Sequence, residues 1–292
     1  MALDASIVSL NLRVPRTRTA TATAEFPLDV GSRTDPGRVR ENNEDCLLVA
    51  PKLNLFALSD GMGGLACGEV ASRMTVDTLL DHCQEAYENP ALAVFGKCAE
   101  GVNDTSRRLA SAIQLANRIV YRAAHEKGSA RGMGATVVAV RYAKDRLTVA
   151  HIGDSRAYRL REGRFEQLTH DHSFAAEQVR LGQLTEDEAY GSGLRNILTR
   201  AVGVEPEVEV EIREERLLAG DVVLLCSDGL THELSDKQIA AVLRDAKNAQ
   251  EAAARLVDLA NRAGGADNIT AIVLRQPGGV SRKGVLSRWF SR

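Results

Sequence analysis

Residues 55–61 read LFALSDG, and residues 222–229 read VVLLCSDG. In both stretches an apolar strand runs directly into an aspartate, Asp60 or Asp228, that stands beside a glycine. A strand that is apolar at nearly every position has both faces buried, so the aspartate at its end lies close to the interior. Asp-Gly is also a common hairpin turn signal, which is the simpler interpretation of either stretch taken alone.

Two further aspartates extend this pattern. Residues 147–154 read LTVAHIGD and end at Asp154, whereas Asp267 precedes the apolar stretch 269–274. Several carboxylates at the ends of buried strands need compensation, most simply by a cation. Oxygen ligands without a His/Cys cluster favour Mg²⁺ or Mn²⁺ over zinc, and two such ions can activate water for hydrolysis of a phosphate ester. The aspartates together therefore predict a metal site.

The segment 40–45, RENNED, supplies a candidate partner for a phosphate group. Arg40 carries a planar guanidinium that matches the geometry of phosphate oxygens. Glu44 and Asp45 add acidic groups near the predicted metals. A surface ion pair is the alternative interpretation of Arg40 taken alone.

The rest of the chain predicts blocks of strands and helices rather than alternating β-α-β units. Hydrophobic periodicity predicts helices at 68–88, 104–127, 235–246 and 248–263, with Asp104 as a cap. Apolar runs predict strands at 26–31, 46–50, 53–59, 135–142, 146–152, 157–160, 165–168, 208–212, 221–227 and 269–274. Residues 171–203 are polar and glycine-punctuated, as in a mobile surface segment. This order favours an α+β fold with largely antiparallel sheets.

Composition argues against several classes of protein. The chain has 292 residues with 37 basic and 39 acidic side chains, a formal net charge of −2, which argues against a nucleic-acid-binding protein. Five cysteines are an odd number and show no CxxC spacing, so we expect a reducing compartment and a cytoplasmic protein. No apolar run approaches the roughly 18 residues of a transmembrane segment, and no signal-peptide core precedes a small-residue cleavage site.

Seven motifs in this order resemble the metal-dependent serine/threonine phosphatases of the PP2C (PPM) family. The first two resemble its bacterial branch. The resemblance extends from about residue 28 to 275. Its motifs are RENNED at 40–45, SDGMGG at 59–64, GMGAT at 132–136, GDSR at 153–156, LTHDHS at 168–173, SDG at 227–229 and DN at 267–268.

The resemblance implies a four-layer α-β-β-α sandwich of two antiparallel sheets flanked by helices. It also implies two Mn²⁺ or Mg²⁺ ions in a cleft at one end. Asp60 would bridge the two ions, and Gly61 would donate its backbone carbonyl. Asp228 and Asp267 would ligate one ion. Asp154 matches the position associated with a third, weaker ion in the bacterial branch.

The same resemblance implies the mechanism and the substrate. Glu44 would hold a metal-bound water, with Asp45 in support, and residues 174–203 would form a flap beside the cleft. The water, its pKa lowered, would attack phosphorus in line, while Arg40 and the ions offset charge on the phosphoryl oxygens. Arg40, Asp60 and Glu44 are therefore the predicted catalytic residues. No phospho-enzyme is needed, so we expect the cysteines to be small apolar filler.

One position departs from the pattern of animal members, which place a histidine directly after the bridging Asp-Gly as a proposed general acid. Here that position is Met62, which leaves the acid open. His170 and His172 lie in a motif nearby, and their alternative is a structural, hydrogen-bonded role; a metal-bound water is the other candidate acid. Residues 90–103 form an insertion that we interpret as a surface loop.

The predicted organisation is a flexible arm at 1–25, a phosphatase domain at 26–276 and a basic tail at 277–292. An organelle transit peptide is the alternative for the arm. The tail contains Trp289 and Phe290 among basic residues and is suited to weak contact with an anionic membrane or a partner protein; a solvated end is the alternative. We expect a monomer.

The leading functional hypothesis is a bacterial-type phosphatase that acts on phosphoserine and phosphothreonine in proteins and opposes a Ser/Thr kinase. A second hypothesis is a pseudophosphatase that binds phosphoproteins without turnover; the intact Arg40, Asp60, Asp228 and Asp267 argue against it. A third is a regulator whose arm or tail is the active part, and the sequence contains no visible sensor domain to support it.

Overall fold

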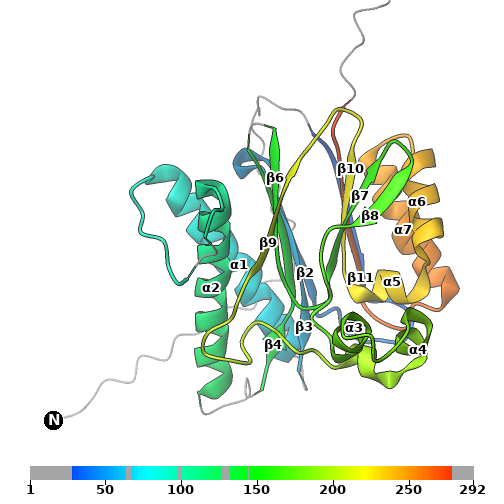
Figure 1. Ribbon diagram of the computed structural model, residues 1–292, viewed down its shortest axis with the longest axis horizontal. Coiled ribbons are helices and arrows are strands. Elements are labelled where there is room, and N and C mark those ends of the chain that lie inside the picture. The colour runs from blue at the N-terminus through cyan, green and yellow to red at the C-terminus, as the bar shows by residue number, and fades with distance from the viewer. Residues whose placement is uncertain (1–27, 64–66, 98–99, 127–131, 144, 278–292) are drawn as a thin grey trace, which may run out of the picture.

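The computed structural model describes residues 28–63, 67–97, 100–126, 132–143 and 145–277. The predicted arm at 1–25 lies outside these ranges, as does the predicted tail apart from residue 277. Two sheets pack face to face between two groups of helices (Figure 1). The predicted four-layer α-β-β-α sandwich is confirmed.

The two sheets, which we name sheet A and sheet B, have only antiparallel pairs among the described strands. Sheet A has, in spatial order, β1 (Asp29–Asp35), β11 (Ile269–Arg275), β10 (Val222–Cys226), β7 (Arg156–Arg161) and β8 (Arg164–Gln167). Sheet B has, in spatial order, β2 (Asp45–Ala50), β3 (Leu55–Met62), β5 (Val137–Ala143), β6 (Arg146–Ile152) and β9 (Glu211–Arg216), with β4 (Gly134–Ala135) paired to β3.

Helices cover the outer face of each sheet. Sheet B packs against α1 (Cys67–Glu88) and α2 (Asp104–His125). Sheet A packs against α5 (Asp228–Glu233), α6 (Asp236–Asp245) and α7 (Ala249–Ala263) on the opposite side of the molecule (Figure 1).

The segment between β8 and β9 contains short helices only. These are α3 (Phe174–Arg180), α4 (Glu186–Gly191) and the 3-10 turn η2 (Gly193–Asn196); a second 3-10 turn, η1 (Pro51–Leu53), joins β2 to β3. Ser173 caps α3, and Thr185 and Glu188 form a capping box at α4. These caps satisfy backbone N–H groups that helices of only one or two turns leave unpaired.

The alternation of side chains explains why the central strands are apolar at nearly every position. In β3, Leu55 and Ala57 pack toward α1 and α2, whereas Phe56 and Leu58 enter the core between the sheets. The strands of a four-layer sandwich bury both faces, so no polar face is needed. This is why each central strand can carry an aspartate only where the strand ends.

The predicted strand at 208–212 is wrong in its position. The structure begins β9 at Glu211 and continues it to Arg216. Glu211 is the register partner of His151 in β6, and β6 ends one residue later, before Gly153 turns with φ +100°. Residues before Glu211 therefore lack a regular partner strand, although they alternate Val and Glu.

Two predictions about helix starts also need correction. Asn103, not Asp104, caps α2, because Asn103 Oδ1 accepts a hydrogen bond from Ser106 N at 3.0 Å. Asp104 is instead the first helical residue, where its negative charge favours the helix N-terminus. The short helix α5, which begins at Asp228, was not predicted, since Ser227-Asp228-Gly229 was interpreted as a strand end and turn.

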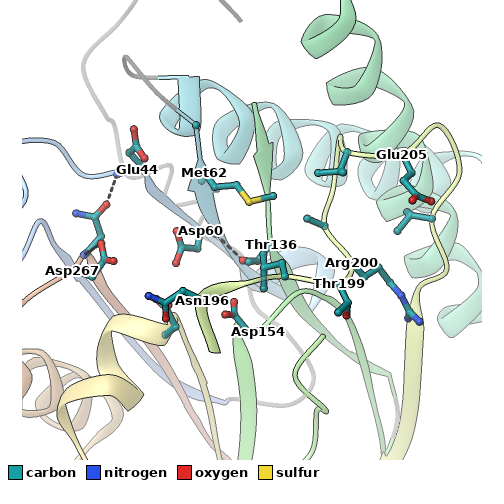
Figure 2. Close-up of a pocket in the computed structure, with 18 of the residues that line it drawn as sticks. Glu44, Asp60, Met62, Thr136, Asp154, Asn196, Thr199, Arg200, Glu205 and Asp267 are labelled. Atoms are coloured by element: carbon teal, nitrogen blue, oxygen red, sulfur yellow. Dashed lines mark hydrogen bonds between the residues drawn. The ribbon is translucent and has the colours of Figure 1, made fainter. Parts of the chain in front are cut away.

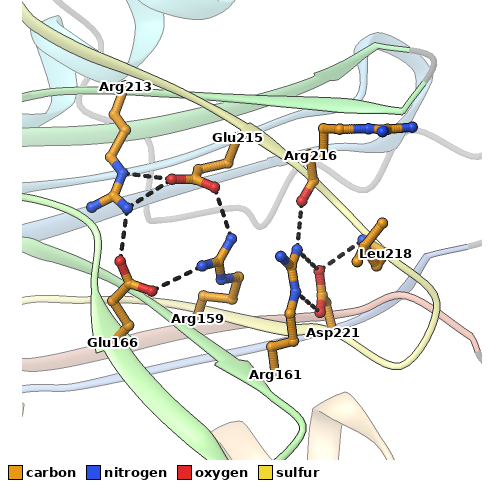
Figure 3. Close-up of polar contacts among 8 residues, drawn as sticks. All are labelled: Arg159, Arg161, Glu166, Arg213, Glu215, Arg216, Leu218 and Asp221. Atoms are coloured by element: carbon orange, nitrogen blue, oxygen red, sulfur yellow. Dashed lines mark hydrogen bonds and ion pairs between the residues drawn. The ribbon is translucent and has the colours of Figure 1, made fainter.

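A closed ring of four ion pairs joins the edge of sheet A to the edge of sheet B (Figure 3). Arg159 contacts Glu166 and Glu215, each at 2.8 Å. Arg213 contacts the same two glutamates, each at 2.7 Å. β8 and β9 are the edge strands of their sheets. The ring therefore connects the two sheets through side chains at the edge where backbone pairing ends.

Beside the ring, Arg161 and Asp221 form a two-point ion pair that we expect to stabilise the fold. Arg161 Nε and Nη2 donate to Asp221 Oδ1 and Oδ2 at 2.8 and 2.6 Å, and the Asp221 side chain is 1% exposed. Arg161→Met leaves this buried carboxylate without its cation. It should lower the free energy of unfolding by about 3 kcal/mol, the low end for a broken buried pair, because part of Arg161 reaches solvent.

Urea denaturation of the Arg161→Met variant measures this loss. The matched control is Arg164→Met, which removes an exposed arginine at the start of β8 and should change stability by no more than about 0.5 kcal/mol. Equal stabilities of the two variants would contradict the assigned role of the pair.

Candidate active site

Two carboxylates meet where β2 begins and β3 ends. Asp45 in β2 is the register partner of Asp60 in β3. The buried Asp45 accepts hydrogen bonds at Oδ2 from Ser227 Oγ at 2.9 Å and from Thr270 Oγ1 at 2.6 Å. Ser227 and Thr270 belong to the sheet A side, so Asp45 ties the two sheets together next to Asp60.

Asp228 and Asp267 come from the other sheet. Asp228 directly follows Ser227 at the end of β10, and Asp267 lies shortly before β11. Because β10 and β11 are antiparallel neighbours, the end of one strand and the start of the other lie at the same edge. The aspartates at the ends of these apolar strands therefore lie at one end of the sandwich.

Asn268 holds the 40–45 segment in place, a role that the sequence analysis did not assign. Its Oδ1 accepts a hydrogen bond from Glu44 N at 2.8 Å. Its Nδ2 donates to the backbone oxygens of Pro36 and Asn42 at 3.0 and 2.8 Å. Its sequence signal was its place in the DN motif at 267–268, directly after Asp267.

All the predicted site residues except Asp45 line one cleft of about 600 Å³ (Figure 2). They line it as follows: Arg40, Glu44, Asp60, Gly61, Asp154, Asp228 and Asp267. Asp45 is not among the lining residues and lies behind Asp60 as a buried neighbour. Asn196, Thr199 and Arg200 from the predicted flap also line the cleft, and Asn196 was not among the predicted site residues.

Burial and mutual repulsion raise the pKa values of the clustered carboxyl groups. Loss of hydration raises the pKa of Asp60 well above its usual value, and the charges of Asp45 and Asp228 raise it further. Burial likewise raises the pKa of Asp154 well above its usual value and that of Asp45 to about 7, and it also raises the pKa of Glu44. A cation bound among these groups would favour their charged forms.

The donor atoms fit divalent cations. Asp45 Oδ1 and Asp228 Oδ1 are buried and have no hydrogen-bond partner, a costly arrangement for an acceptor unless a cation or a donor reaches it. The carboxylate and carbonyl oxygens in the cleft are hard ligands of the kind that Mg²⁺ and Mn²⁺ prefer.

Arg40 lies among the same groups. Its Nη2 is 2.9 Å from Asp267 Oδ2, and 56% of its side chain is exposed. Hydrogen bonding to Asp267 raises the pKa of Arg40 further above its usual value, so the guanidinium is charged at every relevant pH. An exposed, permanently charged guanidinium in the cleft can bind a phosphate group.

His170 and His172 do not line the cleft. His172 Nδ1 accepts a hydrogen bond from Gly153 N at 3.1 Å, and its Nε2 lies 3.3 Å from Glu211 Oε2. His170 Nδ1 lies 2.8 Å from Glu211 Oε1. His151, His172 and Glu211 place potential metal-ligand atoms within 4.8 Å of one another, but these hydrogen bonds already use both ring nitrogens of His172. The contacts support the structural interpretation of the two motif histidines.

Burial argues against a nucleophilic role for three of the described cysteines. None of the four that the structure describes is joined in a disulfide. Burial raises the pKa of Cys46 and Cys83 to about 11 and that of Cys226 to about 12. Such thiols stay protonated at neutral pH and react slowly. Cys98 lies outside the described residues.

Residues 38–267 match the sequence profile of the family described as protein phosphatase 2C. The chain belongs to the protein phosphatase 2C family. The resemblance that the motifs suggested is confirmed, and the protein phosphatase 2C match contains all of the predicted site residues.

Bacterial protein phosphatase 2C relatives are similar over most of the chain. Serine/threonine protein phosphatase PstP of Mycobacterium tuberculosis is 39% identical over 247 residues, which are 84% of this chain and 44% of that protein. Serine/threonine phosphatase stp of Listeria welshimeri is 36% identical over 247 residues, which are 84% of this chain and 94% of that protein. The chain thus spans less than half the length of the mycobacterial relative.

The solved structure of a relative with this fold contains metal ions. The catalytic domain of serine threonine protein phosphatase PstP, in complex with two manganese ions, superposes with a TM-score of 0.71 at 37% identity. The comparison covers 85% of this chain and 97% of that one. Metal dependence is therefore supported by a close structural relative as well as by the donor atoms of the cleft.

Proposed function

We propose that the protein is a metal-dependent protein phosphatase that hydrolyses phosphoserine and phosphothreonine in other proteins. The observation that carries this proposal is the convergence of Asp60, Asp154, Asp228 and Asp267 with Arg40 in one cleft of a protein phosphatase 2C fold. The serine/threonine phosphatases among the relatives support the choice of substrate.

Two Mn²⁺ or Mg²⁺ ions form part of the proposal. Asp60 would bridge them, Gly61 would offer its carbonyl, and Asp228 and Asp267 would complete the set on one ion. The related structure with two manganese ions supports this number. Such ions, when bound, lower the pKa of water and offset the charge of the phosphoryl oxygens. We assign Asp154, which lines the same cleft, to a third ion.

The remaining work falls to side chains of the cleft. Arg40 would orient the phosphate by two-point hydrogen bonding, and Glu44 would orient water beside the ions, with Asp45 supporting the site from its buried position. Met62 lines the cleft and has no proton to give. Among the described residues no histidine lines this cleft, so the proposal assigns no imidazole the role of general acid.

Hydrolysis of p-nitrophenyl phosphate and of a phosphothreonine peptide tests the proposal. We expect turnover with Mn²⁺, loss of turnover with excess EDTA, and loss of more than about 100-fold in Asp228→Asn, since outer-shell partners alone cost about 10–100-fold. Asp258→Asn changes a half-buried carboxylate that lies outside the cleft and is paired with Arg33, and it is the control. Peptide binding by folded protein without turnover would contradict the proposal and favour a pseudophosphatase.

The biological setting is also a proposal. We infer that phosphorylated proteins are the substrates, that a Ser/Thr kinase is the opposing enzyme, and that the phosphatase domain at 26–276 acts as a monomer. None of the helices in the described part of the chain has the length and apolar character needed to cross a membrane. The lack of disulfides among the described cysteines suits a reducing compartment, and we place the protein in the cytoplasm.

A further inference from the structure

A pair of buried hydroxyl groups connects the backbone of Asp60 to Ser155, the residue that follows Asp154. Thr136 Oγ1 lies 2.7 Å from Ser155 Oγ, and both residues are no more than 3% exposed. Thr136 Oγ1 also accepts a hydrogen bond from Asp60 N at 3.0 Å. Ser155 directly follows Asp154, so one short chain of hydrogen bonds runs from Asp60 to the turn that carries Asp154.

Thr136 is itself firmly held. It lies between β4 and β5, and its N–H donates to Asp60 O at 2.8 Å. Its carbonyl accepts a hydrogen bond from Ser59 Oγ at 2.5 Å. Figure 2 shows Thr136 between Asp60 and Asp154 in the cleft wall. The side chain therefore has a fixed position relative to the end of β3.

The turn at Gly153 packs directly against the Thr136 side chain. A Cβ atom on Gly153 would lie 2.7 Å from both Cβ and Cγ2 of Thr136, and Gly153 has φ +100°. Glycine alone adopts this conformation without strain and permits so close an approach. The backbone of the turn can therefore reach the threonine side chain.

The far side of the same turn is held by His172. His172 N donates to Gly153 O at 3.0 Å, and Gly153 N donates to His172 Nδ1 at 3.1 Å. The turn is thus fixed by Thr136 on one side and by His172 on the other, and the Asp154 side chain lines the cleft.

We propose that Thr136 is a positioning residue whose hydroxyl sets the spacing between the Asp60 and Asp154 carboxylates and thereby the affinity of the cleft for divalent ions. This inference rests on the proposed function. Thr136→Val keeps the shape of the side chain but leaves Asp60 N–H and Ser155 Oγ without their shared partner. The two carboxylates can then move apart, and this lowers the affinity of the pair for a cation.

Titration calorimetry with Mn²⁺ tests the proposal without relying on activity. Thr136→Val should raise the Kd of at least one Mn²⁺ site by about 10–100-fold, as expected for a residue that supports a metal ligand. Thr136→Ser retains the hydroxyl and should stay within about 3-fold of wild type. Ser155→Ala should weaken Mn²⁺ binding in the same direction, and the double variant should lose less than the product of the two single effects.

Thr148→Val is a matched control for the burial of a threonine. Thr148 is buried in β6, and its hydroxyl lies 2.9 Å from Ser106 Oγ on the α2 side of sheet B. It does not line the cleft. Thr148→Val should lower the melting temperature while leaving the Kd for Mn²⁺ within about 2-fold.

The outcomes separate the possibilities. If Thr136→Val and Ser155→Ala lower stability as Thr148→Val does, yet keep wild-type Mn²⁺ affinity, Thr136 is only a packing residue and the inference is overturned. If Thr136→Val does not fold, Ser155→Ala and Thr136→Ser decide by the same Kd. A wild-type protein that binds Mn²⁺ but hydrolyses no phosphoester contradicts the proposed function alone; one that binds no Mn²⁺ overturns both.

Discussion

Asp60→Asn should lower Mn²⁺-dependent hydrolysis of p-nitrophenyl phosphate by more than about 100-fold, beyond the about 10–100-fold typical of residues that only support a metal ligand. Asp60 is in the cleft among Asp154, Asp228 and Asp267, and the proposal gives it contact with both ions. An amide keeps its size but removes the negative charge. Steady-state kinetics at saturating Mn²⁺ measure the loss.

The same substitution should not weaken the metal-free fold. Burial and the neighbouring carboxylates raise the pKa of Asp60 well above its usual value, which means that its charge is unfavourable in the folded protein. A neutral asparagine avoids this penalty, so Asp60→Asn in EDTA should unfold at the same or a higher urea concentration than wild type. Mn²⁺ should stabilise wild type and have little effect on the variant.

Asp258→Asn is the control for both measurements, because Asp258 is a half-buried carboxylate outside the cleft, in an ion pair with Arg33 at 3.0 Å. It should keep wild-type activity and the wild-type response to Mn²⁺. Turnover in Asp60→Asn within about 3-fold of wild type would show that the site assignment is wrong. A variant much less stable than wild type in EDTA would contradict the electrostatic argument.

Removal of metal should destabilise the protein more at pH 7.5 than at pH 5. With Mn²⁺ at about 100 times its Kd, a gain of roughly 2.7 kcal/mol corresponds to about 5 °C in melting temperature for a protein of this size. We expect this increment at pH 7.5 and a clearly smaller one at pH 5. Thermal unfolding scans in Mn²⁺ and in EDTA at the two pH values measure it.

The sign follows from the raised pKa of Asp45, which burial moves from 3.8 to about 7. A carboxyl group whose pKa is higher in the folded state stabilises the metal-free fold below about pH 4, and this contribution is lost as the pH rises to about 7. Protons also compete with Mn²⁺ for the carboxylates that line the cleft at low pH. An increment independent of pH would show that the carboxyl cluster does not bind the ion.

Much of the fold was predictable because it follows from local patterns. The strands around Leu58 and Leu225 are apolar on both faces, and the structure buries them between two layers. The long helices α1 and α7 carry apolar residues at helical spacing and begin and end within about one residue of their predicted bounds. Hydrophobic periodicity and composition depend only on residues that are neighbours in the chain, so the sequence alone shows them.

The errors occurred where long-range contacts decide. Residues 213–216 read REER and have no apolar alternation, yet they form a strand because β6 supplies a partner and the ion-pair ring compensates their charges. The choice of Asn103 over Asp104 as the cap likewise depends on the conformation at which the chain enters α2.

The sequence by itself determined the kinds of groups at the site and their order: an arginine, a glycine and several carboxylates at the ends of buried strands. Only the tertiary structure decided their spacing, because residues such as Asp45, Asp154 and Asp267 are brought together by the register of two packed sheets. It also assigned Thr136 and Asn268 as the groups that hold the carboxylates in place. Those hydrogen bonds join residues far apart in the chain, and no local pattern records them.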